Sequence, residues 1–295
     1  MPELPEVQTV INDLNKKIKG DKIVDFWSNW KKSIKKISGV KFTNEIKGRK
    51  ILGARRLGKN IFIDLSKKNS QSNISEKILY IHLKMTGHLL VKDNSIKVKK
   101  YFDEKVNQYI HHIWYLKNKK GENKTLEFSD LRKFGKIMLV DTEKIKELPE
   151  LKRLGIDAMS RFFRLNKFKE ILKRKNKSAI GLVLIDQLAI AGIGNIYRSE
   201  ILFEAEVNPN KKNGQLKEEE IKKIFYQIKR VLKKAIKMRG TSSSDYRDTA
   251  GAPGKFYTVL KVYRRDGKKC KKCGKLIKRI KMAQRSVFYC SQCQK

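Results

Sequence analysis

The feature that most constrains this chain is the position of its four cysteines. All four lie in the last 26 of 295 residues, as two Cys-x2-Cys pairs with sixteen residues between them: Cys270, Cys273, Cys290 and Cys293. Four thiolates spaced in this way form the tetrahedral ligand set of a structural zinc ion. Disulfides or chance are the alternatives, but an intracellular chain disfavours the first and the cysteine-free residues 1–269 disfavour the second. We therefore predict one structural zinc, with no open position for catalysis.

The charge of the chain indicates a polyanionic partner. Seventy Lys and Arg against 30 Asp and Glu give a formal net charge of +40. Such an excess attracts nucleic acid at long range and strengthens binding through counterion release. A coding bias toward lysine is the alternative explanation of the count, although it leaves the electrostatic consequence unchanged. Charge alone does not separate DNA from RNA.

The sequence contains no sign of membrane insertion or export. No apolar run approaches the ~18 residues of a membrane span. The start, Met1-Pro2-Glu3-Leu4-Pro5-Glu6, is acidic and lacks the basic and then apolar layout of a signal peptide. We expect a cytoplasmic protein, and we expect a monomer because nothing in the sequence argues against one.

Apolar periodicity predicts an α+β fold that changes character along the chain. Residues 5–19 carry apolar side chains at helical spacing, whereas seven short segments rich in β-branched or aromatic residues read as strands. The strand segments are 50–56, 60–65, 77–83, 88–91, 109–116, 125–128 and 136–140. Many short strands with glycine between them favour an antiparallel sandwich or barrel flanked by the N-terminal helix.

The second half of the chain reads as helical. The predicted helices are 162–172, 179–191, 196–204 and 217–238. A polar loop at 241–255 follows, and then the cysteine-rich tail. We place the domains at 1–145 (β-sandwich), 146–160 (linker), 161–256 (helical domain with the loop 241–255) and 257–295 (zinc finger).

A glycine turn lies between two of the predicted helices. In Gly192-Ile193-Gly194-Asn195, the second helix begins near Ile196, and the first amides of a helix are donors suited to phosphate. The alternative is a helix hairpin in which glycine only permits close packing. The turn by itself does not decide between the two.

Six sequence blocks together resemble the formamidopyrimidine-DNA glycosylase / endonuclease VIII family of base-excision repair enzymes. They occur in the family's order and span nearly the whole chain: Pro2 to Val7, Leu57 to Asn60, His82 to Gly87, Asp130 to Gly135, Asp186 to Tyr197 and Gln284 to Cys290. The resemblance implies an N-terminal β-sandwich, a helix–two-turn–helix domain and a C-terminal β-hairpin zinc finger. It also implies damaged double-stranded DNA as the partner.

The resemblance implies four catalytic residues. Once Met1 is removed, the secondary amine of Pro2 attacks the deoxyribose C1′, displaces the damaged base and forms an iminium with DNA. Glu3 protonates the sugar ring oxygen and shuttles protons. Lys59 reaches a DNA phosphate and assists β-elimination, and Arg285 grips phosphates and supports δ-elimination.

The resemblance also implies DNA-binding residues. Met85, Arg132 and Phe134 fill the gap left by the flipped base. Lys177 and Asn195 contact phosphates. His111 stands in for a family histidine that is missing here, and Gly181 occupies a position where relatives place a lysine near the lesion. At both positions the sequence departs from the family pattern.

The predicted activity is that of a bifunctional DNA glycosylase and abasic-site lyase that excises 8-oxoguanine and formamidopyrimidines. The start Pro-Glu-Leu-Pro-Glu and the long loop 241–255 favour this purine type over the endonuclease VIII type, which acts on oxidised pyrimidines. A non-catalytic lesion-binding zinc protein is a second class, and it would not need Pro2, Glu3 or Lys59. An RNA-binding zinc protein is a third, but no base-stacking sheet motif is present.

Overall fold

The structure is a computed structural model that describes residues 1–70, 73–93, 101–242 and 245–295. It divides into two compact units. The first comprises Met1–Lys152 and Met238–Lys255, and the second comprises Arg153–Lys237 and Phe256–Lys295. Among the described residues, no helix combines the length and apolar character needed to cross a bilayer.

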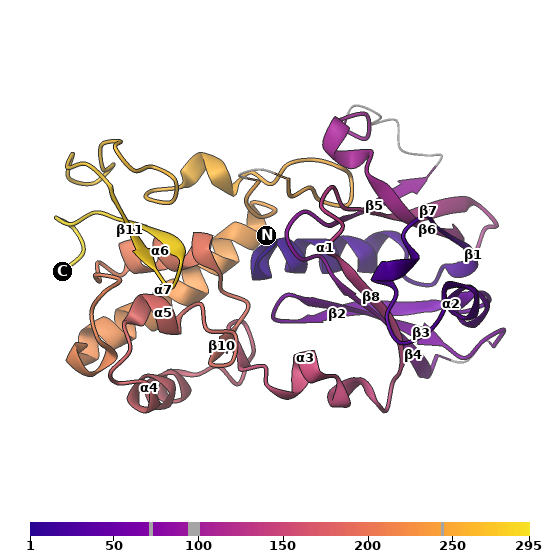
Figure 1. Cartoon of the computed structure of the whole chain (residues 1–295), viewed down its shortest axis with the longest axis horizontal. Coiled ribbons are helices and arrows are strands. Elements are labelled where there is room, and N and C mark those ends of the chain that lie inside the picture. Colours follow the sequence, from indigo (N-terminus) through magenta and orange to yellow (C-terminus); the bar gives the residue numbers. More distant parts are fainter. Residues whose placement is uncertain (71–72, 94–100, 243–244) are drawn as a thin grey trace. The chain divides into compact units, whose positions relative to one another are not determined.

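Two antiparallel sheets of four strands each form the first unit (Figure 1). One sheet has the order β1-β6-β7-β5: β1 (Lys22–Ser28), β6 (Ile110–Lys117), β7 (Asn123–Ser129) and β5 (His88–Asp93). The other has the order β2-β3-β4-β8: β2 (Ile51–Leu57), β3 (Asn60–Ser66), β4 (Ser75–His82) and β8 (Lys136–Asp141).

Helix α1 (Leu4–Lys17) shares one hydrophobic core with both sheets. Its apolar stripe, including Val10 and Leu14, packs with Trp114 of one sheet and Ile63 of the other. A sandwich flanked by its N-terminal helix is therefore confirmed. The opposite face of the second sheet is also covered, by the segment that holds α3 (Pro149–Lys152). The short helix α2 (Gly39–Ile46) completes the unit, and Ser38 caps it by accepting the Lys41 N–H.

The segment Met238–Lys255 belongs to the first unit by its contacts. Tyr246 is buried in the core that α1 shares with the sheets. An isolated bridge between Thr241 and Lys255 closes the segment into a loop. The domain prediction grouped residues 241–255 with the helical domain instead. The difference arises because the anchors of the loop, described below, lie on α1.

The second unit is mainly helical. Its elements are β9 (Ile156–Asp157), α4 (Leu165–Arg174), α5 (Ile180–Val183), β10 (Ile190–Ala191), α6 (Asn195–Glu204), α7 (Glu218–Lys237) and the hairpin of β11 (Lys278–Met282) and β12 (Arg285–Tyr289). The hairpin lies beside α6 (Figure 1). The α+β class, with a helical domain and a C-terminal hairpin, is confirmed.

Three elements differ from the expectation. The helix predicted over 179–191 is wrong, because α5 ends at Val183 and Ile190 instead pairs in parallel with Ile156. The side chain of Gln187 forms hydrogen bonds with the backbone that follows it: it accepts the Gly192 N–H and donates to the Ile193 carbonyl. Strand β1 and helix α2 were not predicted.

Candidate active site and nucleic-acid interface

The chain start is held by the first turn of α1. Pro2 is buried, and Glu3 is the N-cap residue, 3 % exposed. The Glu3 backbone N–H donates to Oε2 of Glu6 at 2.7 Å, which satisfies a helix-end donor that has no partner within the helix. The sequence places a carboxylate three residues after the cap, and the fold uses it to fix the backbone beside Pro2.

The amino group of this chain start lies among charged side chains. Burial lowers the pKa of the Met1 α-amino group below its ordinary value of 8.0, and the Lys59 charge lowers that pKa further. Glu3 and Glu6 act in the opposite direction and raise the pKa. The Met1 side chain is 40 % exposed although its amino group is largely desolvated. The structure thus brings Glu3 and Lys59, two of the predicted catalytic residues, close to the predicted nucleophile.

Lys59 stands in the two-residue turn between β2 and β3. Leu57 pairs with Asn60, and Gly58 has φ +58°, which a glycine adopts without the penalty of a Cβ. The Asn60 side chain donates to the Leu57 carbonyl at 2.9 Å and accepts the Tyr80 hydroxyl at 2.8 Å. Lys59 is only 6 % exposed. It is a fixed, buried cation, unlike the solvated lysines that make up most of the charge.

The loop that carries Arg132 and Phe134 is organised by Asp130. One carboxylate oxygen of this buried residue accepts the N–H groups of Phe134 (2.9 Å) and Gly135 (2.7 Å). The other accepts the Thr86 hydroxyl. Lys133 is held at φ +53°, where a non-glycine residue is strained, and strain of this kind concentrates at functional sites. Asp130 and Thr86 were missed as site residues, because their role depends on bonds that spacing does not reveal.

The three predicted gap-filling residues are displayed outward. Phe134 is 51 % exposed and Met85 41 %, and the Arg132 guanidinium lies 4.6 Å from the centre of the Phe134 ring. Large apolar side chains so exposed on a polar loop are not serving the core. Met85 and Phe134 line a 590 Å³ pocket together with Met1 and Trp30. Its remaining lining is mostly basic: Lys32, Lys35, Lys84, Lys133 and Lys136.

His111 occupies a supporting position. Its Nδ1 lies 2.9 Å from Oδ1 of Asn29, and its Nε2 lies 3.2 Å from the Asp130 carbonyl oxygen. The ring is 7 % exposed, and burial lowers its pKa. Both ring nitrogens are therefore engaged within the protein. The predicted DNA contact of His111 stays a prediction, and it would require one of these bonds to be given up.

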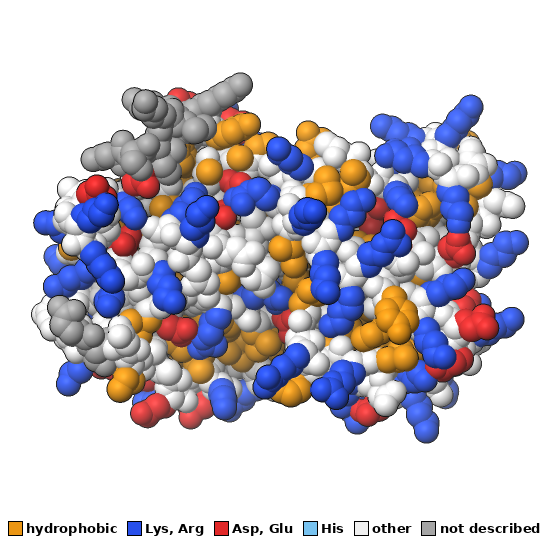
Figure 2. Space-filling model, turned by 180° about the vertical axis from the view of Figure 1, so that it is seen from behind, with side chains coloured by type: hydrophobic (Ala, Val, Ile, Leu, Met, Phe, Trp, Pro, Cys, Tyr) orange, Lys and Arg blue, Asp and Glu red, His pale blue; other side chains and the backbone are white. Residues whose placement is uncertain are grey.

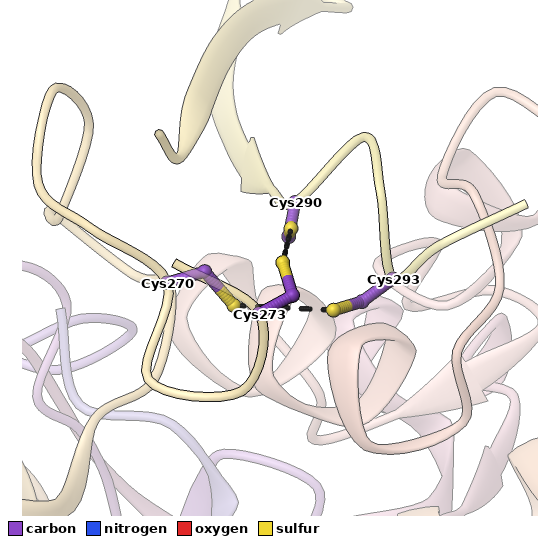
Figure 3. A group of neighbouring side chains, drawn as sticks. All are labelled: Cys270, Cys273, Cys290 and Cys293. Carbon is purple, nitrogen blue, oxygen red and sulfur yellow. Dashed lines mark hydrogen bonds between the residues drawn. The ribbon is translucent and has the colours of Figure 1, made fainter. Parts of the chain in front are cut away.

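The four cysteines converge at the base of the β11–β12 hairpin (Figure 3). Their sulfur atoms all lie within 4.8 Å of one another, with Cys270 to Cys293 at 4.0 Å and Cys273 to Cys290 at 3.4 Å. Zinc–sulfur bonds of about 2.3 Å in a tetrahedron place sulfurs about 3.8 Å apart, so these residues fit the metal. All four are free thiols. The predicted structural zinc site is confirmed.

The hairpin presents Arg285 at its tip. Ala283 and Gln284 form the turn with φ +44° and +61°, a left-handed pair that normally requires glycine or asparagine. Arg285 begins β12 directly after this turn, and its side chain is exposed. Like Lys133, the two turn residues hold a strained backbone beside a residue predicted to contact DNA.

Asn195 and Arg198 tie α6 to that hairpin. The Asn195 side-chain amide donates to the Ser286 carbonyl at 2.9 Å. Arg198 is fully buried and donates to the Gly181 and Ser286 carbonyls and to the Asn195 side chain. The Asn195 side chain is thus engaged with the hairpin, and its predicted phosphate contact stays a prediction. Sequence reasoning missed Arg198, since one arginine among many carries no signal of burial.

Lys177 and Gly181 lie near α5. Lys177 is exposed before the helix, in keeping with a phosphate contact. Gly181 is buried, and a Cβ there would come within 2.8 Å of the Pro209 carbonyl oxygen. A side chain at position 181 would therefore require the backbone at Pro209 to shift, and the lysine that relatives place here has no counterpart in this chain.

The segment Met238–Lys255 is fastened to α1 by charged groups. The Thr241 N–H donates to Oε1 of Glu6 at 2.7 Å. Arg239 makes a paired contact with Asp13 at 2.5 and 3.2 Å, and its Nε donates to Asp248 at 2.7 Å. Residues 243 and 244 of the predicted lesion loop lie outside the described residues. Glu6 therefore connects the backbone of Glu3 with the start of this loop.

Comparison with known families explains why these features occur together. Residues 1–137 match the formamidopyrimidine-DNA glycosylase N-terminal domain, residues 154–247 match the H2TH domain of the same enzymes, and residues 267–295 match the zinc finger found in FPG and IleRS. The chain belongs to the formamidopyrimidine-DNA glycosylase family. It is accordingly a DNA glycosylase of DNA repair with a zinc finger.

Full-length relatives agree. The chain is 36 % identical over 299 residues to the formamidopyrimidine-DNA glycosylase of Desulforamulus reducens, covering 100 % of this chain and 99 % of the relative. Among solved structures, a complex of the Lactococcus lactis enzyme with DNA containing an abasic site is 30 % identical with a TM-score of 0.83, covering 99 % of each chain. A second complex of that enzyme, with N7-benzyl-Fapy-dG DNA, has the same identity and TM-score, covering all of both chains.

Proposed function

We propose that this member of the family excises oxidised purines, 8-oxoguanine and formamidopyrimidines, and nicks the strand by β,δ-elimination. Pro2, exposed as the new N-terminus after Met1 is removed, is the nucleophile. Its nitrogen attacks C1′ and the damaged base departs, leaving an iminium between protein and sugar. A secondary amine forms this iminium directly. Glu3 protonates the ring oxygen and then moves protons during elimination.

The observation that carries this proposal is the setting of the chain start. Burial and the Lys59 charge lower the pKa of the Met1 amino group, which lies next to Pro2. The same surroundings would increase the neutral, nucleophilic fraction of the Pro2 amine near pH 7. The Glu6 carboxylate fixes the backbone of Glu3, so the amine is held in place. A lesion-binding protein without catalysis would have no need for this arrangement.

The remaining residues divide between the two units. Lys59 approaches a phosphate and assists β-elimination, and Arg285 at the hairpin tip binds phosphates and supports δ-elimination. Met85, Arg132 and Phe134 occupy the gap of the flipped nucleotide. Their exposure and the basic pocket beside them support that role. Lys177 and Asn195 contact the backbone, and we propose a monomer in the cytoplasm, bound to the nucleoid.

The decisive experiment is borohydride trapping on a duplex with a single 8-oxoguanine. Borohydride reduces the iminium to a stable amine, so the wild type should become covalently joined to DNA. Pro2→Gly should trap at least tenfold more slowly, and Pro2→Glu, which retains Met1, should not trap. Pro149→Gly, the same substitution at the start of α3, is the matched control and should trap like the wild type. Undiminished trapping by Pro2→Glu would remove Pro2 from the mechanism.

The choice of lesion rests on a separate comparison. The long loop of residues 241–255 favours oxidised purines over oxidised pyrimidines as the substrate. Single-turnover excision should therefore be faster for 8-oxoguanine than for thymine glycol in matched duplexes. The opposite order would assign the enzyme to the oxidised-pyrimidine type while leaving the Pro2 mechanism intact.

A further inference from the structure

A pocket of 380 Å³ in the first unit is walled by lysines and is not used by the proposed mechanism. Lys22, Lys50, Lys117 and Lys119 line it, together with Gly20, Gly48, Asn69, Ser70 and Asn118. Among the described residues that form its wall, none is acidic. Basic side chains are spread over the face shown in Figure 2. At the pocket described above, four lysines converge on one concavity.

Three of these lysines form a row across neighbouring segments. Lys22 is the antiparallel partner of Lys117 on one side and of Lys50 on the other. Directly opposed residues of antiparallel strands point to the same face, and like charges in such pairs repel each other. A sheet that places three cations side by side departs from the usual cross-strand pairing. Such local departures are expected where function requires them.

The fourth lysine is brought in by the turn after β6. The Asn118 side chain accepts the N–H groups of Lys120 and Glu122, both at 2.9 Å, which shapes this turn. Lys119 then extends over Gly20, where a Cβ would lie 3.7 Å from its Cε. That distance is an ordinary van der Waals contact, and it places Lys119 beside Gly20, whose φ of +94° favours glycine.

The nearest carboxylates do not neutralise the cluster. Asp21 is buried and faces Lys124, 3.4 Å away. Glu122 accepts from the Asn118 amide at 2.6 Å. The pocket therefore combines concave shape, twelve ammonium N–H donors on four lysines and uncompensated positive charge, and its chemical complement is a run of phosphates.

The pocket lies away from the proposed active-site loop. Tyr109, just before β6, bonds to Asp130, whereas Lys117 ends the same strand. Eight residues of β-strand span about 23 Å, so the two ends of β6 serve different places on the unit.

We propose that this lysine pocket is a second DNA-binding site, which holds the phosphate backbone of a strand that is not engaged in catalysis. Because the family acts on DNA, the ligand at hand is a further stretch of the same polymer or a neighbouring one. This second contact would retain the enzyme on DNA between lesions. Binding at this site is separate from base excision and does not depend on it.

The test compares two triple variants of equal charge change. Lys22→Gln/Lys117→Gln/Lys119→Gln removes the pocket, and Lys41→Gln/Lys146→Gln/Lys152→Gln removes three exposed lysines of the same unit elsewhere. The probe is fluorescent single-stranded dT12, titrated at several salt concentrations in the presence of a short duplex bearing a stable abasic analogue. The pocket variant should bind dT12 at least tenfold more weakly. Its salt dependence should flatten by about two units of log K against log salt, from about 0.7 per lost phosphate contact.

The control variant should bind dT12 within twofold of the wild type, and both variants should excise 8-oxoguanine from a short duplex at the wild-type rate. Equal weakening in the two variants, or normal binding by the pocket variant, would overturn the proposal. A parallel loss of excision in the pocket variant would also overturn it, because the lysines would then belong to the catalytic interface. Absence of excision in the wild type would instead count against the proposed function and leave the dT12 comparison valid.

Discussion

At the scale of single residues, burial and charge both act on the amino group at the chain start. In the proposed mechanism, removal of Met1 moves this group one residue inward, to the buried Pro2. Only the neutral amine is a nucleophile, so a lowered pKa increases the reactive fraction at neutral pH. Only a few charged side chains act on this group, so substituting them one at a time should shift its pKa measurably.

We predict that kcat/KM for excision rises with pH as the amine at the chain start loses its proton, and that the neighbouring charges set the midpoint of this rise. Because Lys59 lowers the pKa of the amine, Lys59→Gln should move the midpoint of the rise to higher pH. Because Glu6 raises that pKa, Glu6→Gln should move the midpoint to lower pH. Lys68→Gln, at an exposed lysine of the same unit, should leave it in place. Midpoints that stay in place in Lys59→Gln and Glu6→Gln would show that these two charges do not control the amine.

Two buried histidines make the first unit sensitive to acid. His112 is fully buried between the rings of Phe26 and Phe128, and burial lowers its pKa to about 3. Burial likewise lowers the pKa of His88 to about 4. The unfolded chain takes up protons at both residues below about pH 6.5, whereas the folded chain does not, so the stability is full above that pH and declines as pH falls.

These two histidines should therefore lower the free energy of unfolding by about 3 kcal/mol between pH 8 and pH 5.5, about 1.4 kcal/mol each. Burial also lowers the pKa of His82 to about 3, so this residue adds a similar amount. All three tryptophans, Trp27, Trp30 and Trp114, lie in the first unit, so urea titration followed by tryptophan fluorescence reports on that unit alone. His112→Phe should reduce the pH dependence by about 1.4 kcal/mol, the share of this one histidine. An unfolding free energy that does not change between these pH values would refute the assignment.

At the scale of elements, the loop of Asp130 shows how one buried carboxylate can shape a recognition surface. Four groups converge on it: the Thr86 hydroxyl and the N–H groups of Arg132, Phe134 and Gly135. Losing one acceptor would leave buried donors without partners, at about 1–3 kcal/mol each.

We predict that Asp130→Asn slows excision ten- to a hundredfold, because its amide NH2 would face the donors of the loop and release Phe134. Asp141→Asn, at a half-exposed carboxylate ending β8, should have little effect. Single-turnover excision, together with the melting temperature, separates a displaced loop from general unfolding. An active Asp130→Asn enzyme would show that the loop does not need this carboxylate.

The elements that could be predicted from sequence are those with an unbroken period. Helix α7 (Glu218–Lys237) and strands β3 to β8 were predicted to within three residues at each end. Strand β1 was missed because a bulge between Ile23 and Asp25 interrupts the alternation of its buried side chains. The apolar run after Ala179 suggested a long helix, yet α5 ends at Val183 and the Gln187 side chain makes local hydrogen bonds to the backbone of residues 192 and 193.

The site residues likewise fall into those that the sequence could predict and those that it could not. Lys59, Arg132 and the cysteines lie in short motifs whose spacing is itself informative. The anchors of the loop after Arg239 could not be found in this way, since Glu6 and Thr241 are 235 residues apart in sequence. Burial likewise distinguishes Arg198 from the other basic residues only once the fold is known.

At the scale of the whole molecule, the zinc site stabilises one part of the second unit. The zinc ligands hold a small core in which Phe203, Val262 and Phe288 pack with Cys270 and Cys290. Because a zinc site of four cysteines contributes directly to folding, its loss should be felt locally in the second unit.

We predict that zinc removal by a chelator disorders the β11–β12 hairpin and weakens binding to lesion DNA at least a hundredfold, since Arg285 loses its support. Tryptophan fluorescence of the first unit should not change. Cys273→Ser should reproduce the effect without chelator, and added zinc should restore the chelated wild type. Full DNA affinity in the metal-free protein would show that the hairpin is dispensable.

The return of Met238–Lys255 to the first unit has a consequence for how the protein is made. Helix α1 leaves the ribosome first, but Glu6 and Asp13 acquire Thr241 and Arg239 only after about 240 more residues have been translated. At 5–20 residues per second this takes roughly 12–50 s. During that interval the nascent N-terminal half lacks Tyr246 from its interior. The polypeptide thus acquires the complete core of its first unit only late in translation.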